Sequence, residues 1–145
     1  MNKFLTISLC VIILSNMLSY TKQDVMLNPQ LVEFYKIRQI QKGINEELPG
    51  LNTGALIEYR VYEPETMKLI NKGTTETSIS STNIPKCVEE TLNYMSRLER
   101  VSLDCPSNLS FTNMNAHRFP GVKEEERYII DFQVWKLTEN SQYEY

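Results

Sequence analysis

The stretch NIPKCVEETLNYMSRLERVSLDCP, residues 83–106, decides the fold that we expect for this chain. From Lys86 to Glu99, its apolar side chains recur at the 3.6-residue period of an α-helix and gather on one side of it. Pro85 suits the first turn, where its missing N–H is no loss. The pattern therefore predicts an amphipathic helix whose apolar side packs against a sheet.

Two cysteines flank this helix, Cys87 at its start and Cys105 beyond its end. A helix that ends at Glu99 is about 20 Å long, and the six residues that follow it span about 20 Å if they are extended. Cys105 can therefore return to Cys87 and close a loop of about 19 residues, which is worth on the order of 3 kcal/mol in the chain-entropy model. We expect a Cys87–Cys105 disulfide. A metal site is not expected, because the chain lacks a Cys-x-x-Cys pair and a second histidine.

Residues 1–21 have the pattern of a secretory signal peptide, with Lys3, an apolar run from Phe4 to Leu14, and small and polar residues after it. The run is shorter than the roughly 20 residues that a spanning helix needs, so we expect no stable membrane insertion. Cleavage would leave 14 basic and 18 acidic side chains and a net charge of −4. This charge offers no surface for nucleic acid. We expect a secreted protein with one domain over residues 22–137 and a flexible tail over 138–145.

The segment before the opening stretch predicts a helix and a hairpin. Strong helix formers extend from Asn28 to Leu48, where Pro49-Gly50 ends the pattern. From Ala55 to Val61 the apolar period changes to two, and a second strand is expected from Met67 to Lys72 after a proline-containing turn. The Thr-rich and Ser-rich segment 73–82 is either an edge strand or a linker.

The segment after Cys105 predicts a second hairpin. Its strands would be Asn108 to Asn115 and Arg127 to Leu137, with a turn at Phe119-Pro120-Gly121. Sheets with one apolar face need a cover, and two amphipathic helices supply it. The expected fold class is thus α+β, a two-layer domain in which an antiparallel sheet of about four strands, from two hairpins, is covered by two helices.

Catalytic groups are scarce. His117 is the single histidine, no Gly-x-Ser-x-Gly elbow occurs, and neighbouring carboxylates lie where surface charge is expected. We therefore expect no catalytic residue, no metal and no cofactor, and hence not an enzyme but a secreted binding protein, inhibitor-like or effector-like, with a protein partner. Gln133 and Trp135, on the outward side of the last strand, are the candidate contact residues. The alternative is that other parts of the chain cover Trp135.

Two other functions stay open at this stage. One is a carrier of a small apolar ligand, whose cavity would be lined by Tyr59, Tyr94, Met95, Phe111 and Phe132. The other is a small secreted hydrolase that uses His117 or distant carboxylates. The sequon Asn108-Leu109-Ser110 would accept a glycan in a eukaryotic secretory pathway if it is exposed.

Overall fold

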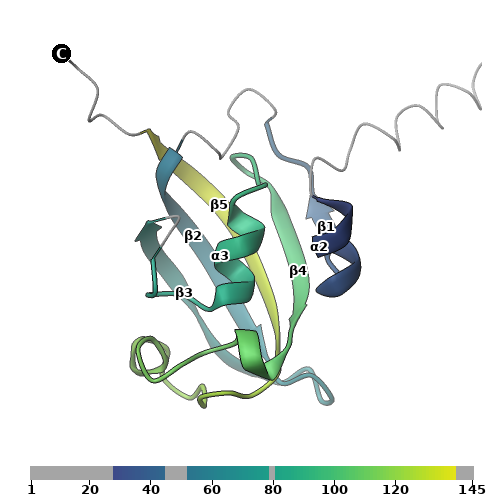
Figure 1. Cartoon of the computed structure of the whole chain (residues 1–145), viewed down its shortest axis with the longest axis vertical. Helices are drawn as coiled ribbons and strands as arrows, with labels where there is room; N and C mark the ends of the chain where they lie inside the picture. The colour runs from purple at the N-terminus through teal and green to yellow at the C-terminus, as the bar shows by residue number, and fades with distance from the viewer. Residues whose placement is uncertain (1–27, 45–51, 79–80, 140–145) are drawn as a thin grey trace, which may run out of the picture.

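The computed structural model describes residues 28–44, 52–78 and 81–139 (Figure 1). The predicted signal peptide and most of the predicted tail lie outside these residues. Among the helices of the described ranges, none has the length and apolar character needed to cross a bilayer. The elements in chain order are α2 (Pro29–Phe34), β1 (Arg38–Gln41), β2 (Asn52–Tyr62), β3 (Leu69–Ser78), α3 (Lys86–Leu92), β4 (Arg100–Cys105), the 3₁₀ helices η2 (Ser107–Leu109) and η3 (Ala116–Arg118), and β5 (Tyr128–Glu139).

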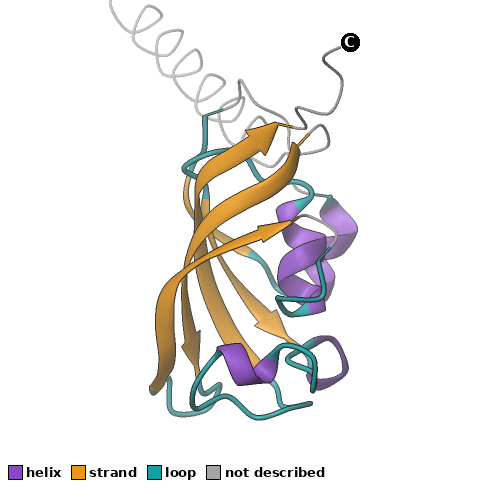
Figure 2. Ribbon diagram, turned by 90° about the vertical axis from the view of Figure 1, so that its left-hand side faces the viewer, coloured by secondary structure: helices purple, strands orange, loops and turns teal. Residues whose placement is uncertain are grey.

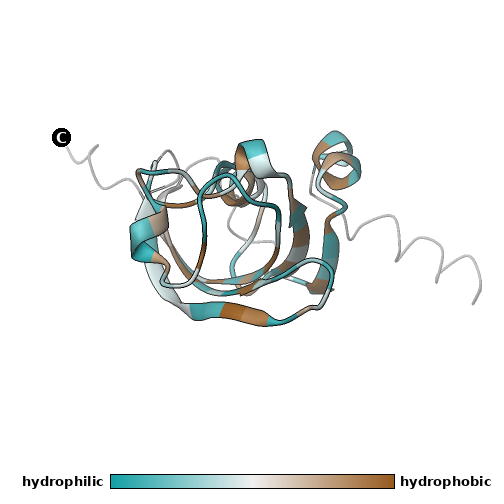
Figure 3. Cartoon of the chain, turned by 90° about the horizontal axis from the view of Figure 1, so that it is seen from below, coloured by the Kyte–Doolittle hydropathy of each residue, from teal (hydrophilic) through white to brown (hydrophobic). Residues whose placement is uncertain are grey.

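The five strands form one antiparallel sheet with the order β1-β4-β5-β2-β3. The long strands β2 and β5 pair at its centre, where Tyr59 lies opposite Phe132. The helices lie on one side of this sheet, α3 across its middle and α2 beside the β1 edge (Figures 1 and 2). Seen from below, the sheet curves around the space that they cover (Figure 3). The α+β class with an antiparallel sheet is confirmed, but the sheet has five strands rather than four.

The predicted helix from Asn28 to Leu48 is wrong for most of its length. It starts as expected, since the side-chain oxygen of Asn28 accepts a hydrogen bond from the Gln30 N–H at 3.0 Å, but α2 ends at Phe34. Lys36 then takes a positive φ of 49°, and the chain enters β1, which pairs with β4. The apolar spacing of this segment fits a helix, and the strand forms only because β4 offers it a partner. Residues 45–48 lie outside the described ranges.

The helix of the opening stretch is confirmed in place and in orientation but is shorter than expected. Its apolar side, including Cys87, Val88 and Leu92, is buried. After Leu92 the chain turns towards β5, and the Leu98 N–H donates to the carbonyl of Val134 at 2.7 Å. The carboxylate of Glu99 accepts a hydrogen bond from the Ser96 N–H at 3.1 Å, which satisfies a donor that a longer helix would have bonded internally.

The first predicted hairpin is present as β2 and β3, and β3 extends through the Thr-rich segment to Ser78. The second is wrong in one strand, because β5 pairs with β4 on one side and β2 on the other. Where the strand 108–115 was expected to begin, residues Ser107–Leu109 form a 3₁₀ helix instead. β5 itself extends to Glu139, two residues into the predicted tail.

Candidate functional site

An apolar pocket lies at the N-terminal end of α3, between that helix, the centre of the sheet and the loop after β4. Its open volume is about 10 Å³, which is close to the least that holds one water molecule. Strand alternation places its sheet residues on one face, because every second side chain of a strand points to the same side. The lining residues are Ile57, Tyr59 and Val61 from β2, Ile130 and Phe132 from β5, Ile84, Pro85 and Val88 around the start of α3, and Phe111 and Phe119 from the loop.

Aromatic rings close the pocket on the side of the loop after β4. The ring of Phe119 lies 5.1 Å from that of Tyr59 and 5.0 Å from that of Phe111, measured between ring centroids. Phe111 in turn contacts the ring of Tyr128 at 5.7 Å in an edge-to-face arrangement. Such arrangements are the favoured geometries of aromatic pairs, so the rings hold one another in place.

Tyr59 contributes its ring to this apolar surface, and its hydroxyl lies next to it, beside β3. Its side chain is half-buried, and the burial raises the pKa of its hydroxyl. Gly73, opposite it on β3, makes room for it, since a Cβ there would lie 2.9 Å from the Tyr59 hydroxyl oxygen. Within the described part of the chain the hydroxyl has no hydrogen-bond partner. Its proton is therefore held at neutral pH and is free to be donated to a ligand.

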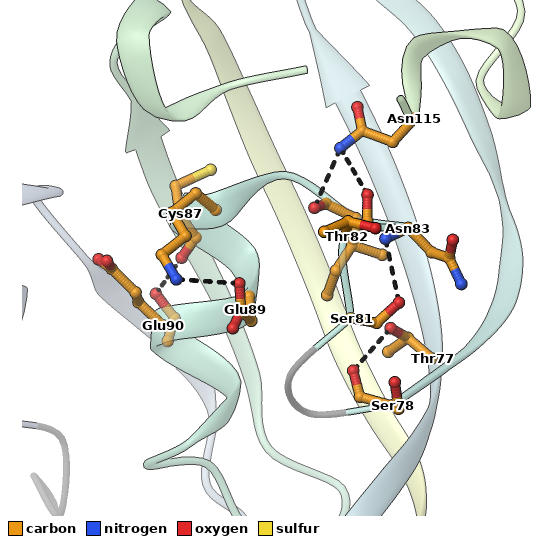
Figure 4. A network of polar contacts seen from close by, with 12 residues as sticks. Thr77, Ser78, Ser81, Thr82, Asn83, Cys87, Glu89, Glu90 and Asn115 are labelled. Carbon is orange, nitrogen blue, oxygen red and sulfur yellow. Dashed lines mark hydrogen bonds and ion pairs between the residues drawn. The ribbon is translucent and has the colours of Figure 1, made fainter. Parts of the chain in front are cut away.

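Two sets of contacts hold the α3 wall of the pocket. Cys87 and Cys105 form a disulfide, with an S–S distance of 2.07 Å, which ties the start of α3 to the end of β4. The side-chain amide of Asn115 donates to the carbonyl oxygens of Thr82 and Ile84 at 3.1 and 3.2 Å (Figure 4). The residues just before α3 are thus fixed to the loop that carries the aromatic rings.

The predicted contact residues lie away from the pocket. Trp135 is 45% exposed, and its ring N–H donates to the carboxylate of Glu58 at 3.0 Å, on the opposite face of β2 from Tyr59. Gln133 is half-buried and donates to the carbonyl of Leu98 at 3.0 Å. Trp135 is therefore not covered by the helices of the described ranges, and the N-terminal segment before Asn28 lies outside them.

Other candidate residues are spread over the molecule. His117 is exposed in η3, and Asn108 is exposed in η2. Across the described ranges, no cluster of three histidine, cysteine or acidic side chains is arranged to hold a metal ion. Of the five residues expected to line a ligand cavity, Tyr59, Phe111 and Phe132 do line the pocket. Tyr94 is 40% exposed, and Met95 is buried elsewhere in the core.

Sequence reasoning missed Ile84, Pro85 and Phe119 as pocket residues. Phe119 was interpreted as part of a turn, and nothing local in Phe119-Pro120-Gly121 distinguishes a buried ring from an exposed one. Its burial depends on β2, some 60 residues earlier in the chain. The available signal was a large aromatic residue directly before a Pro-Gly turn, which is more apolar than most turn residues.

Comparison with known proteins adds a fold class. No protein-family model and no curated protein matches the sequence. Among solved structures, a peptidyl-prolyl cis-trans isomerase from Pseudomonas syringae is similar, with a TM-score of 0.56, 12% identity, and coverage of 71% of this chain and 74% of that one. A multi-domain immunophilin from Arabidopsis thaliana gives a TM-score of 0.60 and 13% identity over 73% of this chain, but the match spans only 43% of the immunophilin. FkpA from Escherichia coli gives 0.55 and 12%, over 71% of this chain and 47% of FkpA.

The described chain therefore has the FKBP-like fold. The comparison contradicts the expectation of a non-catalytic binding protein, inhibitor-like or effector-like, and with it the expectation that the chain is not an enzyme, because the solved structures that share its fold are prolyl isomerases. The sequence argument failed for a physical reason. It searched for nucleophiles, acids, bases and metal ligands, whereas the reaction of the isomerases that share this fold, rotation about a peptide bond, transfers no group that would need them.

Proposed function

We propose that this chain is a peptidyl-prolyl cis–trans isomerase that binds a proline-containing peptide segment at the pocket beside α3. The observation that carries the proposal is the aromatic, apolar lining of that pocket, placed by β2, β5 and α3 in a fold that known isomerases share. A protein or peptide partner also agrees with what such folds bind.

The reaction explains why so few polar groups suffice. A peptide bond resists rotation with a barrier of roughly 18–20 kcal/mol because of its partial double-bond character. An X-Pro bond has cis and trans forms of similar free energy, but they exchange only over tens to hundreds of seconds. A catalyst needs to bind the twisted amide better than the planar one. The twisted amide has lost its resonance and is less polar, so an apolar pocket favours it relative to the planar amide.

Within this proposal, Tyr59 orients the substrate. Apolar pockets commonly contain a few polar groups that fix how a ligand sits. The Tyr59 ring lines the pocket, and its hydroxyl lies beside Gly73 on β3, where burial raises its pKa still further above neutral pH. It donates a hydrogen bond to a substrate carbonyl beside the prolyl ring.

The compartment is part of the same proposal. The Cys87–Cys105 disulfide is buried in the core, and disulfides persist in oxidising compartments. Together with the signal-peptide pattern of residues 1–21, this supports action on secreted or secretory proteins. No cofactor enters the proposed reaction.

The test is direct measurement of isomerisation. The purified, oxidised chain is mixed with a short X-Pro peptide, and cis–trans exchange is followed by NMR or by a protease-coupled assay. We expect exchange faster than the uncatalysed rate in proportion to the protein concentration. No acceleration over a range of residues preceding proline would reject the proposal.

A matched pair of variants tests the role of Tyr59. Tyr59→Phe removes the hydroxyl and keeps the ring, and we expect kcat/KM to fall about fivefold to tenfold, as for the loss of one hydrogen bond. Tyr94→Phe makes the same change at an exposed tyrosine and should leave the activity unchanged. Equal activity of both variants would remove Tyr59 from the mechanism and leave the pocket assignment standing.

A further inference from the structure

The pocket is closed by a side chain of its own loop. Phe119 is 4% exposed and packs its ring between Tyr59 and Phe111, whereas the following Pro120 is exposed. The open volume that remains, about 10 Å³, holds at most one water molecule. A prolyl ring carries three methylene groups and does not fit into it. A substrate therefore gains room only if Phe119 leaves its place.

The loop that carries Phe119 is a small unit with its own internal bonds. The Phe119 N–H donates to the carbonyl of Ala116 and the Val122 N–H donates to that of Phe119, both at 3.1 Å. At its tip, Gly121 has a φ of +90° and packs so closely on β3 that a Cβ would lie 3.3 Å from Ile70 Cγ2. The shape of the turn is therefore held by its own hydrogen bonds, and its tip rests on β3.

A side-chain hydrogen bond joins this loop to the sheet. The amide nitrogen of Asn71, on β3, donates to the carbonyl oxygen of Pro120 at 2.8 Å. This contact holds the residue next to Phe119 and so keeps the ring over the pocket. It links segments that are 49 residues apart in the chain.

The same asparagine limits how firmly the loop is closed. Its other atom, Oδ1, is buried and has no hydrogen-bond partner among the described residues. A buried acceptor without a partner costs free energy, and opening the loop would return it to water. The closed form thus gains one hydrogen bond and loses another. The small difference leaves the open form accessible on the microsecond-to-millisecond timescale on which loops close over active sites.

We propose that Phe119 is the gate of the pocket and that Asn71 is its latch, a positioning residue that acts through Pro120. The inference rests on the proposed isomerase function. A substrate that binds only the open form has an apparent affinity reduced by the fraction of molecules that are open. The strength of the latch therefore sets KM for X-Pro peptides, while the rotation step in the open, occupied pocket is unaffected.

Asn71→Asp is the sharpest variant of the latch. Aspartate keeps the shape of the side chain but cannot donate to the Pro120 carbonyl at neutral pH, and its charge faces that oxygen. We expect KM to fall about fivefold, the equivalent of one net hydrogen bond, with kcat unchanged. Amide hydrogen exchange at Phe119 and Val122 should become faster. Asn113→Asp adds the same charge at an exposed asparagine of the neighbouring loop and should change neither quantity.

Phe119→Leu tests the gate itself. A smaller side chain that only obstructs the pocket should lower KM, whereas the loss of a ring that binds substrate should raise it. Trp135, the single tryptophan, lies on the other face of the sheet, and its unchanged emission shows that each variant is folded. A raised KM in Phe119→Leu, or equal exchange in Asn71→Asp and Asn113→Asp, would overturn the inference.

Failure of the isomerase proposal would be seen separately. If the wild-type chain does not accelerate exchange of any X-Pro peptide, the gate is tested by hydrogen exchange and by binding of the apolar dye 8-anilinonaphthalene-1-sulfonate. Stronger dye binding by Asn71→Asp than by Asn113→Asp supports the gate, and equal binding rejects it.

Discussion

Glu99 is a buried carboxyl group at the turn between α3 and β4, with 4% of its surface exposed. It accepts hydrogen bonds from the Ser96 N–H at 3.1 Å and from the side-chain amide of Gln39, on β1, at 3.2 Å. Burial nevertheless raises the pKa of the carboxyl group, and this effect outweighs the opposing hydrogen bonds. Gly43 completes the cluster, because a Cβ there would lie 1.9 Å from the Ser96 hydroxyl oxygen.

The raised pKa predicts how stability depends on pH. The folded state binds the Glu99 proton more tightly than the unfolded state does, whose glutamate pKa is about 4.3. The contribution of this group to stability is therefore complete below that pKa and is lost as the pH rises through the folded-state value. We expect Glu99→Gln to be more stable than the wild type at pH 7 and equal to it at acid pH, as measured by urea unfolding.

The exposed Glu124→Gln is the control for that experiment, and its unfolding profile should match that of the wild type across the same pH range. A Glu99→Gln protein that is less stable than the wild type at pH 7 would show that the hydrogen bonds of the carboxylate outweigh its burial.

At the scale of elements, α3 depends on two attachments beyond its own hydrogen bonds. The disulfide ties its first turn to the end of β4, and the Tyr35 hydroxyl, after α2, donates to the carboxylate of Glu90 on its outer side. The helix has 7 residues, which is too short to persist without tertiary packing. The position of Val88 at the pocket follows from these attachments.

Replacing both cysteines by alanine should therefore lower the stability of the fold and also weaken substrate binding at the pocket. We expect Cys87→Ala/Cys105→Ala to lower the free energy of unfolding by about 3 kcal/mol, seen as a lower urea midpoint. KM for an X-Pro peptide should rise because the α3 wall is less firmly placed. Equal urea midpoints for the oxidised wild type and the double variant would show that core packing alone holds α3.

The elements also show where sequence patterns are sufficient. The alternation in β2 and β5 and the apolar side of α3 are strong local signals, and all three elements formed at the expected places, although α3 ends at Leu92. β1 has no such signal, because most of its side chains are exposed and the strand exists as an edge against β4. β4 was interpreted as an extended link from the helix back to Cys87, and its pairing with β1 and β5 was not foreseen.

For the whole molecule, the predicted processing in the secretory pathway stays a prediction that one measurement tests. Expression in a eukaryotic secretory host should yield a chain that starts after Ser19 to Thr21, because the apolar run ends before them. Asn108 is exposed in η2, so a glycan there meets no steric barrier from the fold. Intact-mass measurement before and after glycosidase treatment detects both signal-peptide cleavage and glycosylation. An uncleaved N-terminus would contradict the signal-peptide prediction.

The sequence by itself determined the class of fold, the inward faces of β2, β5 and α3, and the pair of cysteines that can meet. These features depend on side-chain period and on distances along the chain, which local sequence records. Tertiary structure decided the pocket. Phe119, Val88 and Tyr59 belong to three separate segments, and they meet only because strand pairing and the disulfide bring those segments together. The face of a sheet that becomes a site depends on which helices and loops pack against it. Those helices and loops come from other segments, so the sequence of one strand does not predict them.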